Sequence, residues 1–198
     1  MQTAPLLPAP ESLDQVRGLF WRPNESFITE LAAALAGKKV LEVFAGNGYL
    51  ACMLARRGVE VLATSLLSGM DAHSEGLYHP VVEFDAVSAV QALGPVHDVL
   101  LMSWPTVTEQ AFLAACLWGD KPICFIGEFT CYASGQLGGC ATDKFFESFA
   151  LERTFASYHG YGIEKACIGK MAAPSRKFRE DKRAWQRQAH QAGKWLPD

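Results

Sequence analysis

After position 38, the apolar residues of the chain fall into short blocks that alternate between strand spacing and helix spacing. Residues 40–45 are apolar apart from one acid, and residues 49–57 repeat apolar positions at helical spacing until Gly58. A strand followed directly by a helix is a βα unit, and a series of such units predicts an α/β fold. Further strands are expected at 59–64, 81–84, 98–103 and 122–126, and further helices at 86–93, 108–118 and 143–151. The unbroken apolar centre of residues 98–103 is typical of a parallel sheet buried on both faces.

Two helices are expected before the first strand. Ser12 followed by Gln15 can form a capping box that opens a short helix to about residue 20. Asn24 can cap a second helix, in which apolar residues recur at helical spacing until Gly37 ends it.

The length of 198 residues is that of one ordinary domain. We therefore expect a single domain in which N-terminal helices (1–37) precede an α/β core (38–171) and a basic C-terminal tail (172–198). Near the end of the core, residues 154–158 and 164–169 are separated by a short turn containing glycine, which favours an antiparallel hairpin.

Charge is distributed unevenly along the chain. Residues 175–198 hold seven Lys or Arg and three Asp or Glu, a net charge of +4, and since the whole chain carries −3, residues 1–174 carry −7. A basic tail can meet phosphate, so nucleic acid is one candidate partner. The small size of this charge favours the alternative, a solvated helix whose aromatic residues Phe178, Trp185 and Trp195 face the body.

The apolar runs are much shorter than the roughly 20 residues that span a bilayer, and the first ten residues do not resemble a targeting signal. We therefore expect a cytoplasmic protein without a membrane partner.

Six cysteines lack CxxC or CxxH spacing, which favours buried free thiols over disulfides or a zinc site. The five histidines show no ligand spacing either, so no metal is expected.

The segment 40–51, VLEVFAGNGYLA, is the most informative part of the sequence. A strand ends at Ala45, Gly46 and Gly48 follow, and a helix begins at once. Glycines at such a turn let a ligand approach the backbone closely, while the helix N-terminus offers free N–H groups. This geometry suits a polar, nucleotide-like ligand. The third glycine of the GxGxxG pattern that binds pyrophosphate is missing.

The segment resembles the first motif of the class I S-adenosylmethionine-dependent methyltransferases, an acidic residue and an apolar residue followed by GxGxG. Phe44 stands where that motif has its first glycine. The resemblance implies a doubly wound, mostly parallel seven-stranded sheet with an antiparallel last strand, and S-adenosylmethionine as cofactor. The residues that it assigns to cofactor binding in this segment are Glu42, Phe44, Ala45, Gly46, Asn47 and Gly48.

Two later positions bear on the same resemblance. Asp85 and Ala86 follow the third expected strand, where the family places an acid that bonds the adenine amino group. The second strand of the family normally ends with an acid that holds the ribose, but here the place is taken by Thr64 or Ser65. A hydroxyl lacks the charge-assisted strength of a carboxylate. Asp71 in the following loop is an alternative ribose partner.

Candidate catalytic residues follow the fourth and fifth expected strands. Ser103, Trp104, Pro105 and Thr106 resemble the (D/N/S)PP(Y/F/W) motif of amino-methylating enzymes, with Trp104 at the first Pro position. In that motif the polar residue binds the target amine and the aromatic ring stacks on a planar group. A Trp packed in the core at a strand end is the alternative. A cytosine C5 enzyme is disfavoured, because it needs Cys where Thr106 stands.

A glycine-rich loop, residues 127–143, is expected to overlie the cofactor. Within it, Glu128 is the first candidate general base and Asp143 the second. The structural alternatives are that Glu128 is a surface residue and that Asp143 is a charge at the start of a helix.

The resemblance implies an S-adenosylmethionine-dependent methyltransferase, with N-methylation of a small molecule or of an exposed group on a macromolecule as one outcome. The acceptor is expected to bind between the N-terminal helices and the loop 127–143. The alternative is a catalytically inactive methyltransferase-like protein that binds or regulates a partner, which Ser65 and the incomplete SWPT motif favour. An oxidoreductase that binds NAD is a third interpretation, disfavoured by the same missing acid.

Overall fold

One mixed sheet organises the chain in the computed structural model, which describes residues 5–8, 21, 23–67 and 76–192. The strand order is β3-β2-β1-β4-β5-β7-β6. The first five of these strands are parallel, and β7 runs antiparallel to both β5 and β6. The strands are β1 (Lys39–Val43), β2 (Glu60–Ser65), β3 (Val81–Glu83), β4 (Val99–Ser103), β5 (Ile123–Glu128), β6 (Phe149–Thr154) and β7 (Glu164–Met171).

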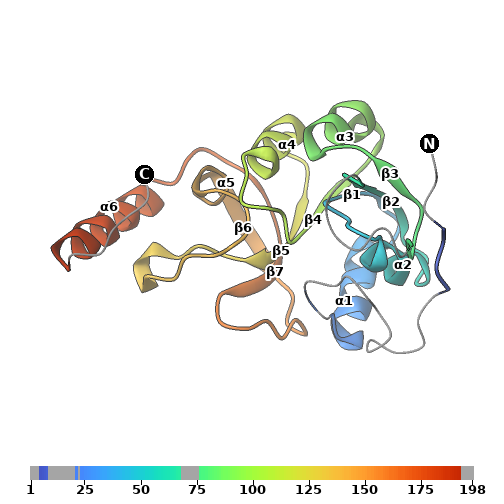
Figure 1. Ribbon diagram of the computed structural model, residues 1–198, viewed down its shortest axis with the longest axis horizontal. Helices are drawn as coiled ribbons and strands as arrows, with labels where there is room; N and C mark the ends of the chain where they lie inside the picture. Colours follow the sequence, from blue (N-terminus) through green and yellow to red (C-terminus); the bar gives the residue numbers. More distant parts are fainter. Residues whose placement is uncertain (1–4, 9–20, 22, 68–75, 193–198) are drawn as a thin grey trace.

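Helices cover both faces of this sheet (Figure 1). They are α1 (Glu25–Leu35), α2 (Tyr49–Ala55), α3 (Ala86–Leu93), α4 (Gln110–Trp118), α5 (Asp143–Ser148) and α6 (Arg176–Gln191), with 3-10 turns η3 (Gly94–Val96) and η4 (Tyr132–Ser134). Neighbouring residues of a strand point to opposite faces, so Leu100 and Met102 pack beneath α3, α4 and α5, while Val99 and Leu101 pack beneath α1 and α2. This two-sided burial explains the unbroken apolar strands of the sequence, and the expected α/β fold with its antiparallel strand is confirmed.

The expected helix at 143–151 is shorter than the sequence pattern indicates, and the strand after it begins earlier. The helix ends at Ser148, and Phe149–Thr154 forms β6 in place of the expected strand at 154–158. Phe149 and Leu151 pair with Met171 and Gly169 of β7. These long-range backbone pairings override the local helical spacing, which the sequence pattern alone does not reveal.

The start of α1 agrees with its predicted cap. The side chain of Asn24 accepts a hydrogen bond from the backbone N–H of Phe27 at 2.7 Å, and Gly37 adopts a left-handed φ of 70° just beyond the helix. The helix expected from Ser12 lies outside the described residues, as do Asp71 and Trp195.

The tail forms α6, which extends from the body beside the segment around η4 (Figure 1). The ring of Tyr132 in η4 lies 5.4 Å from that of Phe178 and 5.5 Å from that of Trp185, as the solvated-helix interpretation predicts for these aromatic residues. Lys and Arg side chains of the helix pair with carboxylates, for instance Lys182 with Asp143. Such pairing offsets part of the positive charge that would attract phosphate. Nucleic acid binding by the tail remains the disfavoured alternative.

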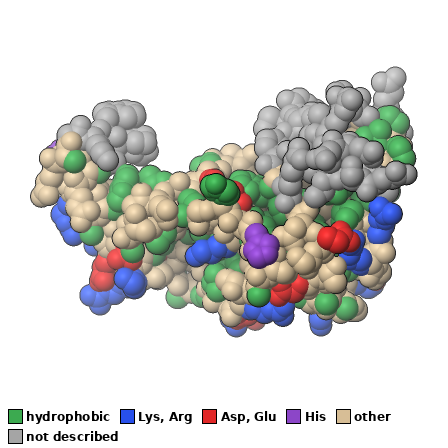
Figure 2. Space-filling view, turned by 90° about the horizontal axis from the view of Figure 1, so that it is seen from below, with side chains coloured by type: hydrophobic (Ala, Val, Ile, Leu, Met, Phe, Trp, Pro, Cys, Tyr) green, Lys and Arg blue, Asp and Glu red, His purple; other side chains and the backbone are tan. Residues whose placement is uncertain are grey.

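On the face seen in Figure 2, described basic and acidic side chains are interspersed rather than gathered by sign. In the part of the chain that the structure describes, no helix is both long enough and apolar enough to cross a membrane. All six cysteines are free thiols, as predicted, and four of them are buried, whereas Cys116 is exposed and Cys131 is half-buried.

Candidate functional site

The glycine loop after β1 has an unusual backbone. Phe44, Gly46 and Gly48 adopt left-handed φ values of 61°, 55° and 75°. The N–H of Ala45 donates to the carbonyl of Thr64 at 3.0 Å, which ties the loop to the end of β2. A Cβ added to Gly46 would meet no heavy atom within 4 Å among the described residues. Gly46 therefore leaves open space at the loop, as a ligand approaching the backbone requires.

Gly48 serves a different purpose from Gly46. A Cβ at Gly48 would stand 2.9 Å from the side chain of Val81 and 3.1 Å from the carbonyl of His79. Gly48 thus lets α2 begin against the start of β3, and cofactor contact by Gly48 remains a prediction.

Two polar residues of the segment 40–51 are buried, Asn47 within the glycine loop and Glu42 in β1. Asn47 is buried, and its side-chain oxygen accepts a hydrogen bond from the N–H of Tyr49 at 3.2 Å. Glu42 is 1% exposed, and its carboxylate accepts a hydrogen bond from the backbone N–H of Ala51 in α2. Burial raises the pKa of Glu42 to about 8. Its second carboxylate oxygen has no hydrogen-bond partner among the described residues. Glu42 therefore holds α2 to β1, and cofactor contact by Glu42 remains a prediction.

Burial of Glu42 predicts a pH-dependent stability. Because its folded pKa of about 8 lies above the ordinary value of 4.5, the stability linked to its bound proton is complete below pH 4.5 and is lost as the pH rises to about 8. Glu42→Gln cannot lose a proton. We expect the free energy of unfolding of the variant to improve relative to that of the unmodified protein between pH 5 and pH 8, in urea denaturation at fixed salt. If the free energies of unfolding of the two proteins changed in parallel over this pH range, Glu42 would not be protonated in the folded protein.

At the end of β2, Ser65 lies opposite Glu83 of β3 in the parallel register. Glu83 is exposed. A carboxylate thus stands beside the position where the resemblance expects the ribose acid, although it belongs to the neighbouring strand. The sequence gives no sign of this, because it does not show the register of β2 against β3.

Asp85 caps α3, and Ala86 begins that helix as a buried residue. One carboxylate oxygen of Asp85 accepts from the backbone N–H of Ser88 at 2.9 Å, and the other accepts from the Ser88 hydroxyl at 2.6 Å. These hydrogen bonds lower the pKa of Asp85. Asp85 therefore has a structural role as the cap of α3, and its hydrogen bond to adenine remains a prediction.

Two substitutions separate these roles of Asp85. Asp85→Ala is expected to lower the free energy of unfolding by about 1 kcal/mol, whereas Asp85→Ser retains a capping oxygen and should change it little. If Asp85 also bonds the adenine, both variants bind S-adenosylmethionine about tenfold more weakly, since a buried partner is left unpaired. Thermal denaturation and calorimetry measure the two effects, and unchanged affinity in Asp85→Ser would restrict Asp85 to the cap.

Ser103 ends β4, and Trp104 and Pro105 follow it at the same edge of the sheet. Ser103 is buried, and Trp104 adopts a left-handed φ of 50° while its backbone N–H donates to the carbonyl of Ile126 at 2.7 Å. The carbonyl of Pro105 accepts from the N–H of Ala141 at 3.3 Å. The indole N–H of Trp104 is buried and finds no acceptor among the described residues. An unpaired buried donor is costly, so it is a candidate contact for a ligand.

The segment after β5 folds back over Glu128, whose carboxylate accepts from the backbone N–H of Gly139. Asp143 accepts from the hydroxyl of Tyr132 at 2.7 Å and pairs with Lys182. Both candidate bases are thus engaged in holding the loop 127–143 and α6. Proton transfer by Glu128 remains a prediction.

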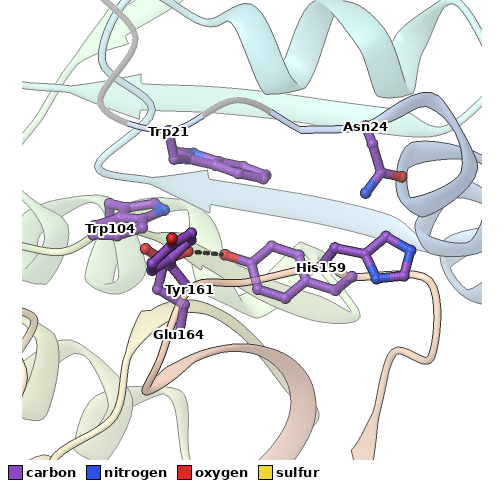
Figure 3. A pocket seen from close by; sticks show the side chains of 7 residues that line it. Trp21, Asn24, Trp104, His159, Tyr161 and Glu164 are labelled. Carbon is purple, nitrogen blue, oxygen red and sulfur yellow. Dashed lines mark hydrogen bonds between the residues drawn. The ribbon is translucent and has the colours of Figure 1, made fainter.

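A pocket of about 190 Å³ lies next to Trp104 (Figure 3). Its walls come from the segment before α1, the end of β4, the β6–β7 connection and the first residue of β7. The lining residues are Trp21, Asn24, Trp104, Tyr158, His159, Tyr161 and Glu164. Trp21 and Asn24, which precede α1, bring the N-terminal segment to this pocket, and acceptor binding by the N-terminal helices remains a prediction. The loop 127–143 contributes none of the lining residues, and the connection 155–163 lies there instead.

The candidate residues meet because parallel strands present their carboxyl ends at one edge of the sheet. The order β3-β2-β1-β4-β5 reverses direction between β1 and β4, and ligands of open α/β sheets bind at such a switch point. The glycine loop follows β1, and Trp104 follows β4. The glycine loop and the pocket therefore lie on the two sides of the place where this architecture receives ligands.

Comparisons with solved structures agree with this architecture. The chain is similar to a mutant of MtNAS in complex with S-adenosylmethionine, with 14% identity over 74% of this chain and 62% of that one, and a TM-score of 0.52. A second similar structure is described under the conversion of a disulfide bond into a thioacetal group during echinomycin biosynthesis. That similarity has 13% identity, 87% and 91% coverage, and a TM-score of 0.51. Neither a scan against protein-family models nor a search of the curated proteins found a match. The fold is that of the class I methyltransferases.

Proposed function

We propose that the protein is an S-adenosylmethionine-dependent methyltransferase whose acceptor binds in the pocket beside Trp104. This proposal is supported mainly by two features at the switch point between β1 and β4. The glycine loop, with open space beside Gly46, follows β1, and the pocket lies next to Trp104, which follows β4. The resemblance of residues 42–48 to the first methyltransferase motif and the class I fold support the same cofactor.

The described residues fit S-adenosylmethionine. The backbone at Gly46 leaves space for the ligand, and Ser65 with Glu83 would face the ribose. Asp85 would bond the adenine in addition to capping α3. When bound, the cofactor supplies a methyl group on a sulfonium, which an acceptor can attack directly. What the protein contributes is alignment of the acceptor and exclusion of water, and aligned reactants gain several kcal/mol, up to about 7–11.

We further propose that the methyl group is transferred to a nitrogen of the acceptor. The proposal is supported by the resemblance of Ser103 and Trp104 to the motif with which amino-methylating enzymes bind their target amine, and by the indole N–H of Trp104, which has no partner among the described residues. We also place the protein in the cytoplasm, and six free thiols support a reducing compartment.

Isothermal calorimetry with S-adenosylmethionine, S-adenosylhomocysteine and NAD, each added to the purified protein, tests the proposal. We expect the first two to bind and NAD not to bind. Binding of NAD alone would support the oxidoreductase interpretation, and binding of none would favour the inactive methyltransferase-like protein.

A further inference from the structure

The pocket beside Trp104 has a chemical character that the sequence did not reveal. We infer that it receives a protonated amine and that Glu164, the first residue of β7, is the carboxylate that pairs with it. This inference rests on the proposed function, because it takes the pocket as the acceptor site. It goes beyond that function by naming the acceptor class and a residue that recognises it.

The charged residues of the lining favour a cationic ligand. Neither Lys nor Arg is among the described residues that line the pocket, and Glu164 supplies its carboxylate. His159 lies across the pocket from Trp104 (Figure 3). A carboxylate in a lining that holds no Lys or Arg among the described residues disfavours anionic ligands and favours a cation. The amide of Asn24 is already engaged, since it donates to the carbonyl of Ser157 at 3.1 Å and accepts from the N–H of Phe27.

The aromatic rings that line the pocket also favour a cationic ligand. Trp21, Trp104, Tyr158 and Tyr161 all contribute rings, and the faces of such rings attract ammonium groups within about 6 Å. The ring of Tyr158 lies 6.0 Å from that of Trp21 and 4.9 Å from that of Phe27, so the wall is fixed by packing. Rings around one carboxylate form a recurring kind of site for alkylammonium ions.

Hydrogen bonding orients the carboxylate. The hydroxyl of Tyr158 donates to Glu164 at 3.4 Å, and Figure 3 shows this contact between neighbouring lining side chains. Burial and the charge of Glu164 together raise the pKa of Tyr158, so its hydroxyl remains a donor. The indole nitrogen of Trp104 is turned toward these side chains in Figure 3 and has no described acceptor. A ligand oxygen close to the amine would accept that N–H.

Size limits the ligand. A volume of about 190 Å³ is below the roughly 300–1,000 Å³ of pockets for drug-sized molecules. The pocket therefore suits a small free amine or the end of one amine-bearing side chain.

In methyl transfer the ammonium proton passes to Glu164 or to solvent, and the nitrogen lone pair forms the N–C bond. The C–S bond breaks at the same time, and its electron pair stays on sulfur.

Titration of tryptophan fluorescence with tetramethylammonium chloride and butylammonium chloride tests the inference, with sodium acetate and sodium chloride as ionic controls. We expect saturable binding of the two ammonium salts alone. Glu164→Gln keeps an acceptor for Tyr158 but removes the charge, and should weaken ammonium binding at least tenfold. Glu60→Gln is the matched control, because Glu60 is exposed at the opposite, amino end of β2 and should leave binding unchanged.

Calorimetry of S-adenosylmethionine with the same samples separates the two proposals. Cofactor binding without ammonium binding, equal binding of acetate, or an unchanged affinity in Glu164→Gln would overturn the inference and leave the proposed function standing. Ammonium binding without cofactor binding would overturn the proposed function, and with it the acceptor role of the pocket. Tighter binding of butylammonium than of a short lysine peptide assigns a small-molecule acceptor, and the reverse order assigns a protein side chain.

Discussion

Gly46→Val is expected to reduce the affinity for S-adenosylmethionine at least a hundredfold. The space beside the Cα of Gly46 is open among the described residues, and we propose that the cofactor occupies it. A branched side chain there would meet the ligand rather than the protein. A hundredfold loss corresponds to about 2.7 kcal/mol, the size of effect expected when a ligand can no longer reach its backbone contacts. Calorimetry on the purified variant measures it.

The same substitution also strains the backbone, since Gly46 has a φ of 55°. Gly58→Val controls for this strain, because Gly58 has a φ of 80° and equally open space among the described residues but lies between α2 and β2, at the opposite edge of the sheet. Both variants should lose similar stability, and only Gly46→Val should lose cofactor affinity. Equal affinity in the two variants would show that the cofactor does not approach Gly46.

Ser65→Asp is expected to strengthen cofactor binding about tenfold. A carboxylate at the end of β2 would accept charge-assisted hydrogen bonds from the ribose hydroxyls, which are stronger than those of the serine hydroxyl. The new charge stands opposite Glu83 in the register of β2 and β3, so we also expect a small loss of stability, in the range of 0.2–1 kcal/mol, roughly, for like charges across strands. Calorimetry and thermal denaturation of the variant measure the two effects.

Glu83→Gln shows which carboxylate the ribose uses. If Ser65 faces the ribose alone, Glu83→Gln leaves the affinity unchanged and combines with Ser65→Asp to restore stability. Should Glu83→Gln weaken binding and Ser65→Asp fail to improve it, Glu83 holds the ribose from the neighbouring strand and the assignment of Ser65 is wrong.

The sequence predicted the α/β fold well because its signals are local. The apolar strands, the glycines after β1 and the cap at Asn24 each depend on residues close in the chain. The boundary between α5 and β6 was predicted wrongly, because Phe149 becomes a strand residue only by pairing with Met171, 22 positions away. Long-range pairing of this kind leaves no pattern in the sequence around it.

The residues of the candidate site also fall into those that local motifs predicted and those that only the fold brings together. Gly46 and Trp104 were predicted from motifs, and the structure puts them at the same edge of the sheet. Glu164 and Tyr158 were missed, because nothing near them in the sequence resembles a motif and only the β6–β7 connection brings them to Trp104. The structural roles of Asp85 and Glu128 were also open until their partners, Ser88 and Gly139, were known.

We propose that the glycine loop and the pocket beside Trp104 serve one methyl transfer. A crystal structure of the protein with S-adenosylhomocysteine tests it most directly. We expect the adenosyl group above the carboxyl ends of β1, β2 and β3, close to Gly46, with the sulfur directed toward Trp104. A ligand bound away from Gly46, or a sulfur directed away from the pocket, would contradict the claim.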